Sequence, residues 1–290
     1  MSRTPGVAGR SLSQFMTTAA ITNGLHPPGE VVLEFKDVEL GFDQHLVLRG
    51  ISFRLHRGET KILFGVAGSG KSVILKLAMG LLKPDAGTIT VLENEVSSMP
   101  ENKLFELRRR IGMVFQESAL FDSLTVEENV AFRLIEEHIP PDEIRERVTE
   151  ALRFVELEHT LQKFPSELSG GMRRRVAIAR AIVTQPEIIL YDSPTGGLDP
   201  ITSTTIVELL VKQRDVYQTS ALMVTHRLQD GFTMATHYYD QQKGQMVPVR
   251  DSGINTNTSF LILRDGKVIF DGGGHEIAAS TDEYIREYIS

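Results

Sequence analysis

Cysteine is absent from the 290 residues of this chain. Disulfide bonds and thiolate metal sites are therefore excluded, and the absence fits a reducing compartment. A run of 18 apolar residues is also absent, so the sequence predicts no membrane-spanning helix. The N-terminus lacks the basic segment and the clean apolar core of a secretory signal. Any role at a membrane is therefore expected to depend on a partner protein.

Positively charged residues are fewer than negatively charged ones. The chain has 31 lysines and arginines and 38 aspartates and glutamates, for a net charge of −7. This balance argues against a dedicated nucleic-acid binder, so no nucleic-acid partner is expected. The run Arg173–Arg175 is interpreted accordingly as a solvated helix face. Hydrophobic residues make up 41% of the chain and charged residues 24%. This composition is typical of a globular protein with one large domain or two small ones.

The sequence GVAGSGKS at residues 65–72 has the form G-x-x-x-x-G-K-[ST], which binds phosphate chains. A strand is predicted before it and a helix after it, which argues against an accidental glycine-rich turn. Glycines let the backbone wrap a phosphate, and the N-terminus of the helix faces the anion. Lys71 is placed to reach the β- and γ-phosphates, and the Ser72 hydroxyl to ligate Mg²⁺. The predicted nucleotide-binding residues here are Gly65, Val66, Ala67, Gly68, Ser69, Gly70, Lys71, Ser72 and Val73.

The segments before this motif predict a tail and two strands. Residues 1–29 are rich in Ser, Thr, Gly and Pro and are interpreted as a mobile tail, within which residues 11–25 could form a short helix. Alternating apolar residues over 31–35 and 51–55 predict half-buried antiparallel strands. Phe42 lies between them in a predicted turn, where it either packs in the core or stacks on an adenine ring.

A mostly helical region over about 117–175 predicts a helical insert in an α/β core. The apolar run before it, residues 111–115, is typical of a buried parallel strand and ends at Gln116. Near the end of the insert, residues 168–172 read LSGGM.

In that second motif Ser169 is a natural N-cap, and Gly170 and Gly171 leave the mouth of the following helix open. An anion could bind there as at the first motif, and the alternative is an ordinary capped helix.

Two further buried strands end in polar side chains. The apolar run over 188–191 ends at Asp192, the acid expected to hold Mg²⁺. The run over 221–225 delivers His226 beside the other strand ends, which favours a functional role for it. Residues 236–258 form a polar segment, interpreted as an exposed excursion or small hairpin.

Taken in order, these motifs resemble those of an ABC-transporter ATPase, the nucleotide-binding subunit, from about residue 31 to residue 274. The resemblance implies an α/β fold with a P-loop NTPase (RecA-like) core, an antiparallel β subdomain and an α-helical insert. The expected boundaries are a tail over 1–29, an ATPase domain over 30–275, with a helical subdomain over about 117–175 and a polar insertion over about 236–258, and a short C-terminal helix over 276–290.

The resemblance also implies roles for individual residues. Phe42 would stack on adenine, residues 65–72 would form the Walker A loop, and Ser169, Gly170 and Gly171 would belong to the signature motif that contacts the nucleotide. The implied catalytic residues are Lys71, Gln116, Asp192 and His226, and the implied metal ligands are Ser72, Gln116 and Asp192. Residues 197–199 would be the D-loop, and Gln116 would lie beside the surface that meets a permease. The implied cofactors are ATP and Mg²⁺.

Three stretches narrow the resemblance to the ATPases of Mla-type, MCE-associated lipid transporters. They are residues 71–76 (KSVILK), residues 119–126 (ALFDSLTV), and residues 191–192 taken with 197–201. This likeness implies transport of phospholipids or related lipids. It also implies a second copy of the chain, integral-membrane permease subunits and an MCE-domain lipid-binding protein as partners. The implied location is the cytoplasmic face of the inner membrane.

One departure from the family concerns the chemistry directly. The family places a glutamate after the aspartate that corresponds to Asp192, and this chain has Ser193 there. A hydroxyl can orient water but is a poor proton acceptor near pH 7. Glu187, on the same predicted strand, is not expected to reach the site.

Two functions follow from this departure. The chain either hydrolyses ATP at a reduced rate or acts as an ATP-gated clamp or regulatory subunit with little turnover. A third possibility, a soluble ABC ATPase of DNA repair or translation, is disfavoured by the single cassette and the acidic charge balance.

Overall fold

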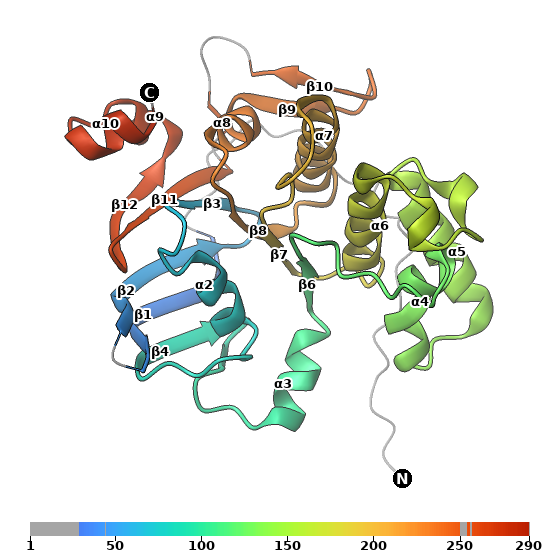
Figure 1. Ribbon diagram of the computed structural model, residues 1–290, viewed down its shortest axis with the longest axis horizontal. Helices are drawn as coiled ribbons and strands as arrows, with labels where there is room; N and C mark the ends of the chain where they lie inside the picture. The colour runs from blue at the N-terminus through green and yellow to red at the C-terminus, as the bar shows by residue number, and fades with distance from the viewer. Residues whose placement is uncertain (1–28, 44, 250–253, 256, 290) are drawn as a thin grey trace.

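The computed structural model describes residues 29–43, 45–249, 254–255 and 257–289. The expected tail, apart from its last residue, and the helix considered over 11–25 lie outside the described residues. A central sheet runs through the described chain, with an antiparallel sheet on one side of it and a group of helices on the other (Figure 1).

The central sheet is six-stranded, and every neighbouring pair from β11 to β6 is parallel, whereas β12 pairs antiparallel with β11. Its inner strands are apolar runs buried on both faces, as expected of parallel strands. Because the carboxyl ends of parallel strands meet at one edge, Gly65 and Asp192 lie together there with the segments that follow β6 and β8. In spatial order the strands are β12 (Lys267–Gly273), β11 (Thr258–Arg264), β3 (Thr60–Gly65), β8 (Ser220–Val224), β7 (Ile188–Asp192) and β6 (Ile111–Val114).

The second sheet is antiparallel and has the order β2-β1-β4-β5. The antiparallel strands predicted over 31–35 and 51–55 are confirmed as parts of β1 and β2. Phe42 is the last residue of β1 and pairs in register with His45, so its prediction as a turn residue is wrong. The strands are β1 (Val31–Phe42), β2 (His45–His56), β4 (Ala86–Val91) and β5 (Asn94–Glu95).

Two apolar cores flank the central sheet. One lies between one face of the sheet and four helices, and the other lies between the opposite face, the antiparallel sheet and α2 (Lys71–Ala78). The four helices are α4 (Val126–Glu136), α5 (Pro141–Phe154), α6 (Gly170–Ile182) and α7 (Pro200–Tyr217). Alternate residues of β3 serve the two cores, with Ile62 and Phe64 in the first and Leu63 in the second. This packing fixes β3, and with it the loop that follows Gly65.

The helices before residue 220 contribute many side chains to the first core. Two of them, α2 and α6, begin at the two predicted phosphate-binding motifs. Residues 117–175 contain α4, α5, two short 3-10 helices and the start of α6. Helix α3 was not foreseen, since Leu104 and Leu107 are its only buried residues. The helices are α2 (Lys71–Ala78), α3 (Glu101–Arg108), α4 (Val126–Glu136), α5 (Pro141–Phe154), α6 (Gly170–Ile182) and α7 (Pro200–Tyr217), with 3-10 turns at Glu158–Thr160 and Pro165–Glu167.

The end of the chain adds a hairpin and three helices. After α8 (Leu228–Thr236), β9 (His237–Asp240) and β10 (Gln245–Pro248) form a small hairpin against α7. Two helices, α9 (Gly274–Ala278) and α10 (Glu283–Ile289), replace the single C-terminal helix expected over 276–290. Asp282 interrupts the expected helix, because its side chain accepts a hydrogen bond from the Ile285 N–H and caps the start of α10.

Candidate nucleotide-binding site

The loop between β3 and α2, residues 65–72, has the geometry of a phosphate cradle (the P-loop below). Gly68 and Gly70 have φ angles of +79° and +95°, in the left-handed region that favours glycine. A Cβ on Gly65 would lie 2.6 Å from Ser69 Oγ and 2.8 Å from the Leu263 carbonyl oxygen, so a side chain is excluded there. Ser69 Oγ is buried and has no hydrogen-bond partner among the described atoms, which leaves it available to an incoming phosphate oxygen.

Lys71 provides a positive charge inside this loop. Its ammonium group donates hydrogen bonds to the Gly65 carbonyl at 2.7 Å and the Val66 carbonyl at 2.8 Å. Burial lowers the pKa of Lys71 below its ordinary value, and the negative charge of Asp192 partly opposes the shift. A phosphate chain would therefore supply a negative charge where the lysine lacks water.

Ser72 and Asp192 lie on either side of the same space. The Ser72 hydroxyl donates to Oδ1 of Asp192 over 3.2 Å, although the two residues are 120 positions apart. A hydroxyl and a carboxylate are hard oxygen ligands, and Mg²⁺ characteristically takes a few of these together with water and phosphate oxygens. The two side chains fit that role, and no group of three or more His, Cys, Asp or Glu residues in the described part of the chain could hold a metal ion.

Gln116, Ser193 and His226 follow the ends of β6, β7 and β8 at this edge. Gln116 and His226 are exposed, so they are open to a ligand. Ser193 is only 7% exposed and has a φ of +47°, and its N–H donates to the Val224 carbonyl at 2.8 Å. A non-glycine residue rarely adopts this backbone conformation, and such strain clusters at functional sites.

The interpretation of Arg173–Arg175 as a solvated helix face is wrong for Arg174. Arg173 is exposed and Arg175 half-buried, but Arg174 is 4% exposed. Arg174 donates to the backbone carbonyls of Gln116 and Ser193, and these contacts pull it inward. The prediction failed because the acceptors lie 58 and 19 residues away and no local pattern indicates them.

Asp230 is a second buried charged residue that the sequence did not indicate. It lies on α8, accepts a hydrogen bond from the Thr195 hydroxyl, and is 3.6 Å from the Arg227 Nε. Burial raises the pKa of Asp230, and the Thr195 hydrogen bond and the charges of Arg227 and His226 oppose the shift. The contact joins the turn after Asp192 to the helix after His226.

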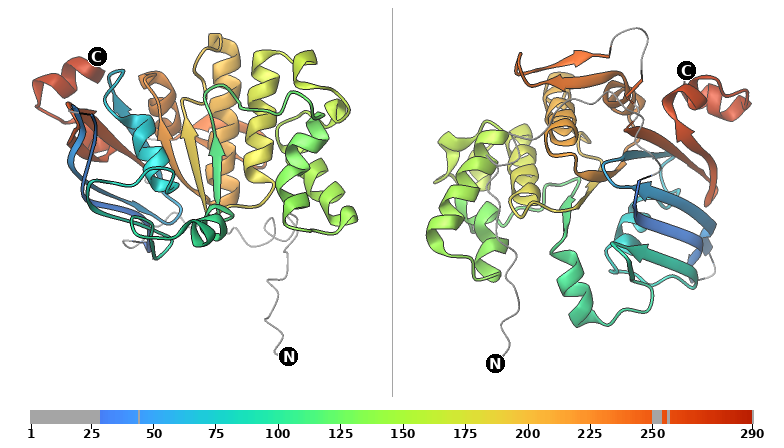
Figure 2. Two further views of the ribbon diagram at one scale, coloured as in Figure 1. Left: turned by 60° about the horizontal axis from the view of Figure 1, so that its bottom comes forward. Right: turned by 180° about the vertical axis from the view of Figure 1, so that it is seen from behind.

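The remaining predicted residues lie on other elements. Phe42, at the end of β1, is 45% exposed, so its ring is not part of the core. Ser169 caps α6, where its Oγ accepts a hydrogen bond from the Met172 N–H at 3.2 Å. The views show α6 well apart from α2, with α7 and central strands between them (Figures 1 and 2). The structure thus unites Lys71, Ser72 and Asp192, and leaves Ser169 away from them.

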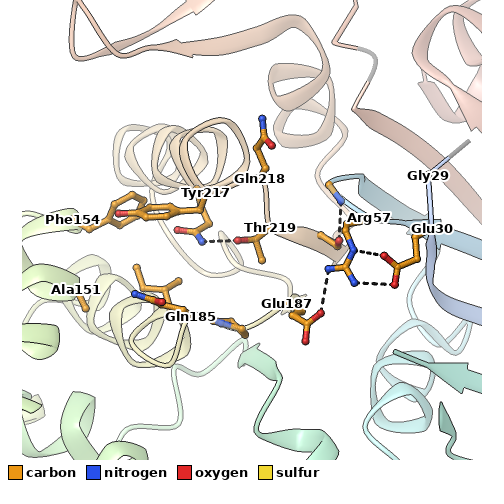
Figure 3. Close-up of a pocket in the computed structure, with 15 residues that line it drawn as sticks. Gly29, Glu30, Arg57, Ala151, Phe154, Gln185, Glu187, Tyr217, Gln218 and Thr219 are labelled. Atoms are coloured by element: carbon orange, nitrogen blue, oxygen red, sulfur yellow. Dashed lines mark hydrogen bonds and ion pairs between the residues drawn. The ribbon is translucent and has the colours of Figure 1, made fainter. Parts of the chain in front are cut away.

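Glu187 lies just before β7, at the end of the strand opposite Asp192. Its carboxylate accepts from Arg110 Nε at 2.5 Å and from Arg57 at 3.1 Å. It lines a 590 Å³ cavity together with Arg57, Glu30 and Tyr217, and no P-loop residue contributes to that cavity (Figure 3). Glu187 is therefore in no position to replace the missing glutamate.

Comparison with known proteins places this geometry in a family. The family model described as "ABC transporter" matches residues 48–196. A plant relative, protein TRIGALACTOSYLDIACYLGLYCEROL 3 (chloroplastic) of Arabidopsis thaliana, is 35% identical over 274 residues, covering 91% of this chain and 75% of the relative. The methionine import ATP-binding protein MetN 2 of Bacillus cereus is 40% identical over 193 residues, covering 67% of this chain. This chain spans only 57% of the length of that second relative.

A solved structure agrees with these sequence matches. An ATP-binding cassette, determined as a dimer in a post-hydrolysis state with ADP and Pi, superposes with a TM-score of 0.68 at 29% identity. The superposition covers 83% of this chain and 98% of the other, so the predicted fold class is confirmed. Among the described residues, no helix combines the length and apolarity needed to cross a bilayer. The chain belongs to the ABC transporter family, as an ATP-binding ATPase subunit.

Proposed function

We propose that the chain hydrolyses ATP to energise a membrane ABC transporter. The observation that carries this proposal is the convergence of Lys71, Ser72 and Asp192 on one P-loop. Lys71 would bind the β- and γ-phosphates, and Ser72 and Asp192 would hold Mg²⁺, which neutralises charge on the transferred group. Gln116 and His226, exposed at the same edge, would orient the attacking water and the γ-phosphate. Phe42 would contribute its exposed ring to the adenine.

The active unit in this proposal is a homodimer. Ser169, Gly170 and Gly171 form the N-terminus of α6, where backbone N–H groups can donate hydrogen bonds to an anion. This helix mouth is well apart from the P-loop of its own chain (Figure 2), so a second copy is needed to bring the two together. The γ-phosphate would be bound between Lys71 of one copy and Ser169 of the other, and its loss would release the dimer.

Changing Ser169 to arginine tests this arrangement. We expect S169R to bind ATP with a dissociation constant within about threefold of wild type, because the P-loop is untouched. ATP-dependent dimerisation should be abolished, because a bulky cation would occupy the mouth of α6. Isothermal titration calorimetry measures the first quantity and sedimentation velocity the second.

The matched control is S169A, which removes the helix cap at a cost of about 1 kcal/mol without adding bulk. We expect S169A to dimerise, though less tightly than wild type. Dimerisation of S169R at wild-type ATP concentrations would contradict the composite site.

For the cargo, we propose phospholipids or related lipids, handled with permease subunits and an MCE-domain lipid-binding protein. Support comes from the plant relative, which is named after a diacylglycerol glycolipid. The match to it covers 91% of this chain. The methionine import relative is matched over only 67% of this chain. The complex would lie at the cytoplasmic face of the inner membrane.

Purification of the chain from membranes with its bound partners tests the cargo. We expect co-purified lipid, identified by mass spectrometry, and stimulation of ATP hydrolysis when that lipid is supplied in vesicles. Stimulation by methionine instead, with no co-purified lipid, would overturn the lipid assignment.

Ser193 favours a second candidate function, an ATP-gated clamp with little turnover. Without a carboxylate after Asp192, ATP would close the dimer and remain bound for long periods. Steady-state phosphate release by the assembled transporter separates the two functions.

A further inference from the structure

Arg174 is the most enclosed cation beside the nucleotide site. It lies on the second turn of α6, five residues after the cap Ser169, and is 4% exposed. Its guanidinium donates to the Ser193 carbonyl at 3.0 Å and to the Gln116 carbonyl, with the Gly196 carbonyl at 3.4 Å. One side chain thereby contacts three backbone carbonyls in two segments around the site, the segment at Gln116 and the turn from Ser193 to Gly196.

Each of these segments has a role in the proposed function. The segment at Gln116 follows β6 and would lie beside the permease. The turn from Ser193 to Gly196 follows Asp192, which would hold Mg²⁺, and leads into residues 197–199. A Cβ added to Gly196 would lie 3.5 Å from Gln116 Cγ, so the two segments also pack against each other. Arg174 connects both segments to α6, the helix whose N-terminus would face the partner's nucleotide.

Ser193 is the contact with the clearest consequence. Its backbone has a φ of +47°, and its carbonyl also accepts the Gly196 N–H at 2.9 Å. The strained conformation is therefore held by the Val224 carbonyl on its N–H and by Arg174 and Gly196 on its carbonyl. Loss of the guanidinium would free this backbone to relax, and the Ser193 hydroxyl would move with it.

Stability alone is a poor explanation for an arginine at this position. Arg174 Nε is buried without a hydrogen-bond partner among the described atoms, and burying a charged group with an unsatisfied donor is costly. Burial lowers the pKa of Arg174, and the negative charges of Glu117 and Asp192 oppose this shift. Glu117 belongs to the Gln116 segment, and Asp192 belongs to the nucleotide site. The residue is surrounded by the site rather than by the hydrophobic core.

We propose that Arg174 is a positioning residue for ATP hydrolysis. It fixes the positions of Ser193 and the Gln116 segment relative to α6, the helix that caps the partner's nucleotide. The proposal rests on the proposed function, because it presumes two nucleotides bound between two copies. Arg174 does not touch the nucleotide in this scheme, so it acts on the chemical step and not on ATP affinity.

The variant R174K tests the proposal, since lysine keeps the charge but cannot bridge three carbonyls from one planar group. We expect kcat for ATP hydrolysis to fall at least tenfold while the dissociation constant for ATP stays within about threefold of wild type. The adjacent R175K is the matched control, because Arg175 lies on the same helix and donates to the Val155 carbonyl, away from the site. R175K should keep kcat within twofold of wild type.

Thermal melting of both variants separates positioning from folding. Equal melting temperatures with a low kcat only in R174K support the proposal, and kcat is measured where both proteins are fully folded. If R174K does not fold, R174Q replaces it, and failure of both to fold would assign Arg174 a structural role and overturn the proposal. An R174K with wild-type kcat would overturn it equally. Absence of turnover in the wild type would instead refute the proposed function.

Discussion

Replacing Lys71 by alanine is expected to weaken ATP binding by about 100-fold or more and to abolish hydrolysis. The variant loses a cation in the P-loop that donates hydrogen bonds to the Gly65 and Val66 carbonyls. Hydrogen bonds to charged groups contribute about 1.5–3 kcal/mol each, and two contacts to phosphate oxygens would account for the loss. Calorimetric titration with MgATP and a phosphate-release assay measure the two effects.

The same substitution should leave the stability of the unliganded protein unchanged or slightly raised. Burial lowers the pKa of Lys71 in the folded chain below its unfolded value, so the folded chain holds this proton less tightly. Below the unfolded pKa, the charged lysine therefore lowers the free energy of unfolding, and its removal relieves that effect. Lys76 on the same helix is exposed, and K76A is the matched control, which should bind ATP normally. Tight ATP binding by K71A would refute the P-loop assignment.

Replacing Ser193 by glutamate is expected to raise the rate of ATP hydrolysis by about 10- to 100-fold. General-base catalysis contributes about 10²–10⁴ to such rates, and the strained backbone at this position reduces the expected gain. The carboxylate would follow Asp192 directly and accept a proton from the attacking water. Steady-state phosphate release by the assembled transporter gives the measurement.

The control for this change is S193Q, which has nearly the same size and shape as glutamate but cannot accept the proton. S193Q should show no gain over wild type. Equal rates for wild type, S193E and S193Q would show that proton transfer at this position does not limit turnover. Brisk turnover of the wild type alone would exclude the clamp function.

The local motifs could be predicted from the sequence because their geometry is encoded over a few consecutive residues. The P-loop needs glycines at positions 68 and 70 for their positive φ angles, and a lysine at the mouth of the helix. The proximity of Ser72 and Asp192 could also be predicted, because Asp192 ends one buried parallel strand, the loop before Ser72 follows another, and the ends of these strands share one edge. The Ser169 cap of α6 followed from its residue type.

Contacts between residues far apart in the chain account for the features that could not be predicted from the sequence. Arg174 stands in a run of arginines, and only the packing of α6 against the ends of β6 and β7 turns it inward while Arg173 remains exposed. The Thr195–Asp230 contact spans 35 residues and depends on where α8 returns to the sheet. Phe42 was assigned to a turn because it lies between two runs of alternating apolar residues, and its pairing with His45 extends β1 to include it.

Sedimentation velocity with and without MgATP tests the central claim most directly, that a nucleotide is bound between two copies of this chain. With MgATP the purified 32.3 kDa protein should shift to a species of twice that mass, and with ADP it should remain a monomer. The shift should be lost in K71A and S169R, and S193E should shorten the lifetime of the dimer. A protein that binds MgATP and stays monomeric at saturation would contradict the account.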